Sequence, residues 1–170
     1  MTLTRRYLAS IAVAGLAAGM LGFGLTRIVA RRPAPELTYT LLDGSVVNTS
    51  HYLGKVVLVS FWATSCSACV AEMPQIAQAH RRWAPSGMHT LAVAMQYDPP
   101  VRVFDFAQAQ QLPFGVVIDN TGGIAAGFGD VQQTPTTFLI DKRGRIARRY
   151  LGAPDFAALD RLISDLLAEA

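Results

Sequence analysis

Cysteine and histidine are scarce in this chain of 170 residues, which has two cysteines and three histidines. A structural zinc ion needs four ligands, usually drawn from these two residue types. Cys66 and Cys69 would have to borrow two ligands from His51, His80 and His89, none of which has zinc-finger spacing relative to the pair. We therefore expect no metal site. A purely structural disulfide is also a poor explanation, since two intervening residues close a very short loop that restrains the unfolded chain little.

Acidic residues are absent from the first 32 positions, which contain five arginines. The remaining residues, 33–170, carry 10 basic and 12 acidic side chains. The net charge of +3 therefore comes from the N-terminal part of the chain. Because the rest has no excess of positive charge and no base-reading motif, we exclude nucleic acid as a partner.

Charge of either sign is missing from residues 7–26, a run of 20 residues that is long enough to cross a bilayer core as a helix. A cleavable signal peptide is the alternative, but the run is longer than a usual apolar h-region and no convincing cleavage motif follows it. We expect residues 1–32 to form an uncleaved transmembrane anchor and residues 33–170 to form one domain. Arginines flank both ends of the run, so the residues alone leave its orientation open.

The domain alternates apolar runs of strand length with helical patterns, which is typical of a three-layer α/β sandwich. Residues 56–62 are almost continuously apolar, as in a strand buried on both faces. We expect a hairpin at residues 37–47 with its turn at Asp43-Gly44. Further strands are expected at 89–95, 114–118, 136–140 and 145–150, and helices at 66–83, 101–111, 120–129 and from 154 onward. Periodicity predicts that the first two helices bury Val70, Met73 and Ala77, and Val103, Phe104 and Ala107, and that Pro74 kinks the first.

Cys66 lies between the apolar run at residues 56–62 and the helical pattern that follows, so we expect it at a helix N-terminus. Unpaired backbone N–H groups and the helix dipole favour a thiolate there. Cys69, one turn further on, is placed to attack a mixed disulfide formed at Cys66. This arrangement indicates a reversible dithiol that is itself the redox group, without a separate cofactor.

Three segments together resemble the membrane-anchored thioredoxin-like reductases of the TlpA/ResA type: residues 54–64, the motif Cys66-x-x-Cys69-x-x-Glu72-Met73-Pro74, and residues 134–141. The resemblance covers nearly all of residues 36–170. It implies a thioredoxin-like fold with a central mixed sheet and an extra strand–helix insertion near residues 94–118. It also implies a single-pass protein of the bacterial inner membrane with its domain facing the periplasm, acting on protein thiols and disulfides and re-reduced by a transmembrane thiol relay.

The resemblance also implies roles for individual residues. Cys66 would be the exposed attacking thiol and Cys69 the resolving thiol. Pro135 matches the family's cis-proline, and the backbone of Thr134 would offer a strand-like edge to a substrate peptide. Glu72 stands where the family has a glutamate that accepts or supplies protons, although the residues alone favour a solvated acid near a helix N-terminus.

Three positions depart from the family pattern. Ser65 stands where most relatives have tryptophan, Ser67-Ala68 stand where proline is frequent, and Ser60 stands where thioredoxins proper hold a buried acid. Trp62 is the nearest large aromatic side chain, and we expect it to support the site by packing. Because such changes alter the reduction potential, how reducing this dithiol is stays open. We expect a reductase of protein disulfides that serves, for example, cytochrome c maturation or copper-site assembly. The alternatives are a disulfide-donating oxidase, or a copper- or partner-binding module that uses the same thiols.

Overall fold

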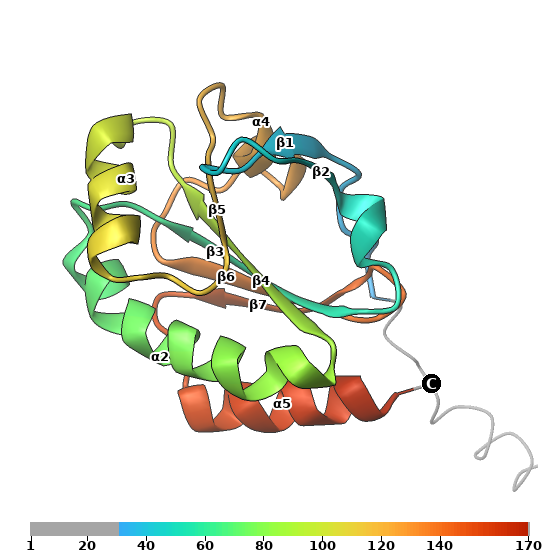
Figure 1. Cartoon of the computed structure of the whole chain (residues 1–170). Helices are drawn as coiled ribbons and strands as arrows, with labels where there is room; N and C mark the ends of the chain where they lie inside the picture. Colours follow the sequence, from blue (N-terminus) through green and yellow to red (C-terminus); the bar gives the residue numbers. More distant parts are fainter. Residues whose placement is uncertain (1–30, 170) are drawn as a thin grey trace, which may run out of the picture. The chain divides into compact units, whose positions relative to one another are not determined.

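The computed structural model describes residues 31–169, which form a five-stranded sheet flanked by helices (Figure 1). The strand order is β5-β4-β3-β6-β7, in which β3, β4 and β5 run parallel and β6 and β7 are antiparallel to their neighbours. The strands of this sheet are β3 (Val56–Trp62), β4 (Met88–Ala94), β5 (Gly115–Ile118), β6 (Thr136–Ile140) and β7 (Ile146–Leu151). The predicted α/β fold with a central mixed sheet is confirmed.

The helices are α2 (Ser67–Trp83), α3 (Pro100–Ala109), α4 (Gly123–Gly127) and α5 (Phe156–Ala168). A separate two-stranded hairpin joins β1 (Thr38–Thr40) to β2 (Val46–Asn48) around the predicted Asp43-Gly44 turn. Two short 3-10 helices, Thr49–Tyr52 and Ala84–Ser86, complete the list. Residues 94–118, where an insertion was expected, contain α3 and β5.

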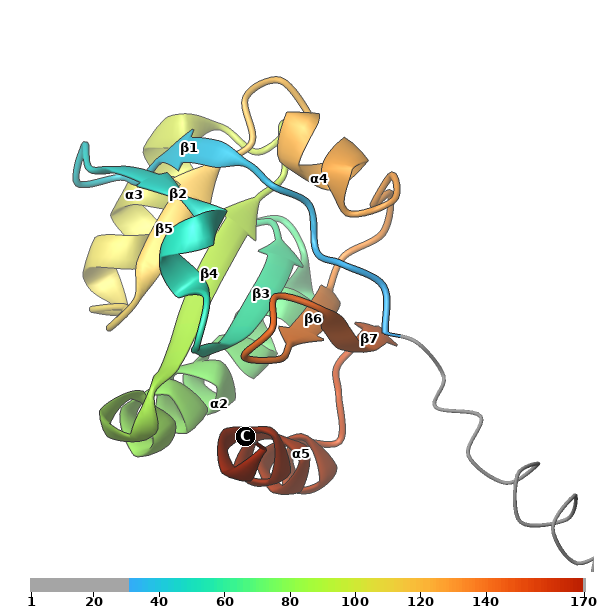
Figure 2. The same ribbon diagram turned by 90° about the vertical axis from the view of Figure 1, so that its right-hand side faces the viewer.

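Strand β3 lies at the centre of the sheet, and all seven of its residues are buried. Successive side chains of a strand point to opposite faces, so β3 contributes to two cores. One core lies against α2, α3 and α5 and includes Leu58 and Trp62. The other lies against α4 and the β1–β2 hairpin and includes Val59 and Phe61. Figure 2 shows α2 and α5 on one side of the sheet and α4 with β1 on the other, which gives three layers.

In each of two helices one residue of the predicted apolar face points outward, whereas Met73, Ala77 and Val103 are buried as predicted. Val70 and Phe104 were expected in the core but are 36% and 43% exposed. Helix α2 buries Cys69 and Ile76 together with Met73. These three residues follow one another at intervals of four and three, which is a helical core spacing, but Cys69 and Ile76 were not predicted as core residues. In α3, Phe106 packs on Trp62 and so turns Phe104 outward. Helix α2 is a single helix that continues through Pro74.

Residues 31–34 are bound to the rest of the domain at the turn after β6, although Arg31 and Arg32 were assigned to the anchor. The Arg31 guanidinium lies 3.0 Å from the Asp141 carboxylate and 2.9 Å from that of Glu169. The backbone N–H of Ile146 donates to the Arg32 carbonyl oxygen at 2.7 Å. No helix within residues 31–169 is both long enough and apolar enough to span a membrane. The predicted transmembrane run, residues 7–26, falls outside the described residues.

Candidate active site

Cys66 and Cys69 form a disulfide at the start of α2. Cys66 is the N-cap residue of the helix, and its Sγ accepts a hydrogen bond from the backbone N–H of Cys69 at 3.2 Å. Cys66 is partly exposed and follows the exposed Ser65, whereas Cys69 is completely buried. A substrate therefore reaches the sulfur of Cys66 first. After reduction, the same N–H and the positive end of the helix dipole stabilise a Cys66 thiolate over the thiol.

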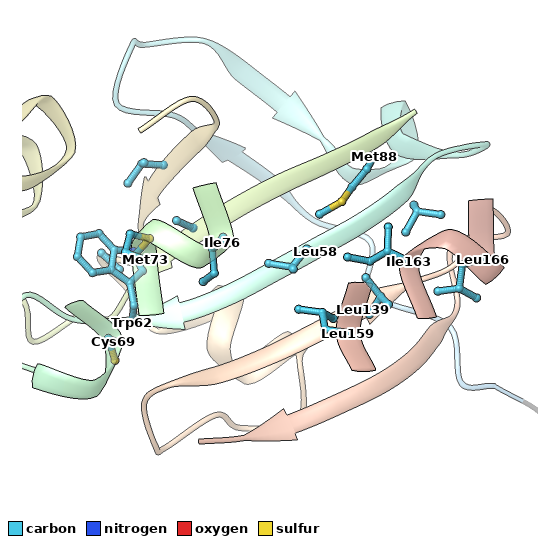
Figure 3. Close-up of a cluster of buried hydrophobic side chains, with 14 of the residues drawn as sticks. Leu58, Trp62, Cys69, Met73, Ile76, Met88, Leu139, Leu159, Ile163 and Leu166 are labelled. Carbon is cyan, nitrogen blue, oxygen red and sulfur yellow. The ribbon is translucent and has the colours of Figure 1, made fainter. Parts of the chain in front are cut away.

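The buried side of the dithiol is formed by Trp62, which ends β3. Its side chain is fully buried, and its ring lies 5.0 Å from that of Phe106, centroid to centroid. Figure 3 shows Trp62, Met73 and Cys69 together at one end of the core cluster, with Ile163 and Leu166 at the other end. Trp62 thus packs behind the dithiol, as its position at the end of an apolar strand had suggested.

The loop before β6 lies at the same edge of the sheet as the dithiol. Its Thr134–Pro135 peptide bond is cis. The next residue, Thr136, is the antiparallel partner of Phe61 on β3, so the preceding loop runs beside the residues that lead from β3 to Cys66. The carbonyl oxygen of Pro135 accepts a hydrogen bond from Gly152 at 2.8 Å. Pro135 is buried, whereas Thr134 is partly exposed at this edge.

Glu72 lies one helical turn after Cys69, on the buried side of α2. Its side chain is only 2% exposed, which excludes the interpretation as a solvated acid. Burial raises the pKa of the Glu72 carboxyl from 4.5 to about 7, because the charged form loses its hydration. Within residues 31–169 neither carboxylate oxygen has a hydrogen-bond partner. Near neutral pH this carboxyl can therefore either release or accept a proton.

Other polar groups are buried in the layer between the sheet and α2. Ser60 and Thr137 are directly paired across β3 and β6, and both are completely buried. Ser60 lies between Leu58 and Trp62 in the strand and so points to the same face as they do. Neither hydroxyl, nor the Trp62 indole N–H, has a protein partner among the described residues. The Ser60 hydroxyl thus stands on β3 at the position where thioredoxins proper have a buried acid, with the Thr137 hydroxyl next to it on β6.

Two further residues of this edge, which the sequence had not indicated, lie in the loop between β4 and α3. The carboxylate of Asp98, 2% exposed, accepts hydrogen bonds from both the backbone N–H and the hydroxyl of Thr64, each at 2.6 Å. The hydroxyl of Tyr97 lies 3.4 Å from that of Thr134. An available signal was their position just after a parallel strand, because the carboxyl ends of neighbouring parallel strands meet at one edge of a sheet.

The residues predicted for the site are thus brought together in two groups. The exposed group at the sheet edge consists of Cys66, Ser65 and Thr134, with the buried Pro135 beneath it. The buried group behind it consists of Cys69, Trp62 and Glu72. This geometry presents one reactive sulfur to solvent, keeps the second beneath it, and holds a titratable carboxyl one turn away.

Comparisons with known proteins agree with this geometry. The Redoxin family model matches residues 30–163. The chain is 33% identical over 127 residues to the thiol-disulfide oxidoreductase ResA of Geobacillus thermodenitrificans, an alignment that covers 75% of this chain and 72% of that protein. It is 31% identical over 141 residues to ResA of Geobacillus kaustophilus, with 83% and 80% covered.

A solved structure shares the architecture as well. It is the crystal structure of a thiol:disulfide interchange protein of the thioredoxin family from Chlorobium tepidum. The superposition has a TM-score of 0.75 at 26% sequence identity and covers 81% of this chain and 97% of the other. With its Cys66–Cys69 disulfide, the chain therefore belongs to the Redoxin family, and within it to the TlpA/ResA-type thioredoxin-like thiol–disulfide oxidoreductases.

Proposed function

We propose that this thiol–disulfide oxidoreductase works as a membrane-tethered reductase of protein disulfides, outside the bacterial inner membrane. The observation that carries the proposal is the pairing of a partly exposed Cys66, capping α2, with a buried Cys69. A thiolate stabilised at a helix N-terminus is an effective attacking group, and a buried second thiol reacts only after the first has bound a substrate. The dithiol serves as the redox group, and the reaction requires no further cofactor.

The reaction begins when the Cys66 thiolate attacks one sulfur of a substrate disulfide. The substrate S–S bond breaks, its second sulfur leaves as a thiolate that takes up a proton, and Cys66 becomes joined to the first sulfur. Cys69 then loses its proton and attacks the Sγ of Cys66, which releases the remaining substrate thiolate for protonation. The substrate gains two electrons and two protons, and the protein gains the Cys66–Cys69 disulfide.

Glu72 is the proposed acceptor of the Cys69 proton in the second step. It lies one helical turn from Cys69, is buried with it, and has a pKa of about 7 because of that burial. A carboxyl that titrates near the working pH is well suited to general acid–base catalysis. Thr134 is the proposed docking point for the substrate backbone, since it lies at the exposed end of the loop before β6.

The cellular setting is proposed from the resemblance to ResA-type proteins and from the uncharged run at residues 7–26. That run would anchor the protein as a single span, with the domain on the periplasmic side. A transmembrane thiol relay would return two electrons to the Cys66–Cys69 disulfide after each cycle. The proposed clients are the haem-site cysteines of apocytochrome c or the oxidised cysteines of copper sites.

Transfer to a client-like peptide tests the reductase proposal. The full-length protein, reduced and purified in mild detergent, is mixed with a synthetic peptide in which a Cys-x-x-Cys-His segment carries an intramolecular disulfide. We expect one peptide disulfide to be reduced per protein, Cys69→Ser to accumulate the mixed disulfide, and Cys66→Ser to be inactive. Failure of the wild-type protein to reduce the peptide, or transfer of its own disulfide to the reduced peptide as the favoured direction, would overturn the proposal.

A further inference from the structure

Two adjacent residues of the β4–α3 loop connect the two loops that flank the dithiol. Asp98 binds Thr64, which precedes Cys66 by two residues, and Tyr97 lies against Thr134, which precedes the cis proline. The β4–α3 loop is thus placed beside both the reacting sulfur and the proposed docking edge for the substrate.

Asp98 holds this loop in place. Both of its carboxylate oxygens are engaged by Thr64, and its own backbone N–H donates to the carbonyl oxygen of Met95 at 2.9 Å. The two residues that follow, Pro99 and Pro100, have φ angles restricted by their rings and lead directly into α3. The backbone beside Tyr97 is therefore held near the dithiol.

The exposure of the Tyr97 ring has no explanation in the packing of the domain. The side chain is 56% exposed, although tyrosine rings usually bury much of their apolar surface. Its hydroxyl contacts the Thr134 hydroxyl, which leaves the ring face accessible at the edge where a substrate must bind. Exposed tyrosine rings held on a rigid backbone are favoured as anchors at binding surfaces, because ordering them costs little entropy.

The segments nearest the dithiol carry little charge. Residues 63–66, 95–99, 131–135 and 151–154 contain a single acidic or basic side chain, that of Asp98. Asp98 is buried and paired. Leu151, which neighbours the cis-proline loop through its pairing with Thr136, is 64% exposed and adds apolar area. Such a surface selects substrates by apolar contact rather than by charge.

We propose that Tyr97 is a specificity-determining residue that favours peptide disulfides with an apolar side chain beside the attacked cysteine. This inference rests on the proposed function, because it assumes that a substrate peptide runs along Thr134. A peptide in that position passes the Tyr97 ring, which contacts the side chain next to the cysteine. An acidic side chain at the same place is desolvated without a partner and is disfavoured.

The experiment compares disulfides of different kinds with the full-length protein in detergent. The probes are two ten-residue peptides with an intramolecular disulfide, bearing leucine or aspartate before the first cysteine, and hydroxyethyl disulfide as a small neutral substrate. Phe104→Ala is the matched control, since Phe104 is also an exposed aromatic ring but lies on α3 against the start of β5, away from the dithiol edge.

For Tyr97→Ala we expect the rate constant for the leucine peptide, divided by that for hydroxyethyl disulfide, to fall about tenfold. The leucine-over-aspartate preference should shrink with it, and Tyr97→Phe should retain most of both because the ring is kept. Phe104→Ala should change neither ratio. Unchanged ratios in Tyr97→Ala, with normal reduction by the wild-type protein, would overturn this inference alone. A wild-type protein that reduces none of the three probes would overturn the proposed function as well.

Discussion

Asp98 binds Thr64 twice, through the backbone N–H and through the side-chain hydroxyl, at 2.6 Å in both cases. The contact joins the loop after β4 to the loop after β3, and Cys66 follows Thr64 by two residues. Because Asp98 is buried, water cannot easily replace the carboxylate as a partner for the two Thr64 donors. Asp98, which follows β4, therefore helps to hold in place the segment after β3 that carries the attacking sulfur of Cys66.

Removal of this contact should weaken the domain. Asp98→Ala leaves the backbone N–H and hydroxyl of Thr64 without their acceptor, and we expect a loss of about 2–4 kcal/mol in the free energy of unfolding. Asp98→Asn keeps one acceptor oxygen and should lose about half as much. Urea denaturation followed by circular dichroism measures both. Equal stability of Asp98→Ala and the wild type would show that the contact contributes nothing.

The raised pKa of Glu72 predicts how stability depends on pH. The folded protein binds this proton more tightly than the unfolded chain does, with a pKa of about 7 against 4.5. The wild type should therefore lose stability as pH rises through this window, and Glu72→Gln should not. Above pH 8 we expect Glu72→Gln to be the more stable protein by up to about 3 kcal/mol.

Parallel denaturation series at pH 5 and pH 8 test this expectation, and the same two proteins test the proton-transfer role. In the wild type, the rate of release of a mixed disulfide should change with an inflection near pH 7. In Glu72→Gln that inflection should disappear. If the free energy of unfolding and the release rate depended on pH in the same way in both proteins, the proton-transfer role of Glu72 would be contradicted.

Arg31 should contribute to stability although it precedes the predicted domain. Its guanidinium pairs with Asp141, a carboxylate with 1% exposure that also accepts hydrogen bonds from Arg145. Burial alone raises the pKa of Asp141, but the hydrogen bonds from Arg145 and Arg31 lower it overall. The pairing therefore stabilises the fold at neutral pH, and this contribution is lost as pH falls through the pKa of the folded state.

Because the Arg31 side chain is 30% exposed, solvent screens the pair, and we expect Arg31→Ala to cost about 1 kcal/mol at pH 7. Arg32→Ala is the control, since the contact of Arg32 with Ile146 uses its backbone carbonyl. Its stability should stay within about 0.5 kcal/mol of the wild type. Thermal unfolding of the wild type and the two variants at pH 7 measures both effects. An equal loss of stability in Arg31→Ala and Arg32→Ala would contradict a specific role for the Arg31 ion pair.

Trp62 should matter for packing and not for the chemistry of exchange. It is fully buried against Phe106. Trp62→Ala should lower the free energy of unfolding by about 3–5 kcal/mol, and Trp62→Phe by clearly less. Per folded molecule, Trp62→Phe should reduce hydroxyethyl disulfide at a rate within about threefold of the wild type. A rate loss of a hundredfold in a folded Trp62→Phe protein would assign the indole a direct role.

Much of the sheet could be predicted from the sequence, because its central strands are continuous apolar runs. The expected bounds of β3 and β6 agree with the structure. Helix faces were harder to predict. Val70 fits an apolar stripe by spacing, but the helix is oriented by Cys69 and Met73, and a cysteine expected to react was not counted as core.

The dithiol could also be found from the sequence, since strand, cysteine and helix are adjacent along the chain. Tyr97 and Asp98 could not, because their contacts with Thr134 and Thr64 span 37 and 34 residues. Such contacts depend on which strand ends meet at an edge of the sheet. The burial of Glu72 likewise depends on how α2 is rotated, which its local sequence does not determine.

The reduction potential of the Cys66–Cys69 couple tests the central proposal most directly. The full-length protein is equilibrated in glutathione or dithiothreitol redox buffers, and its free thiols are counted at each potential. The reductase account predicts a value at or below about −220 mV, in the range of glutaredoxins and thioredoxin. A value near about −120 mV, typical of strong disulfide donors, would contradict it and assign the protein to oxidation.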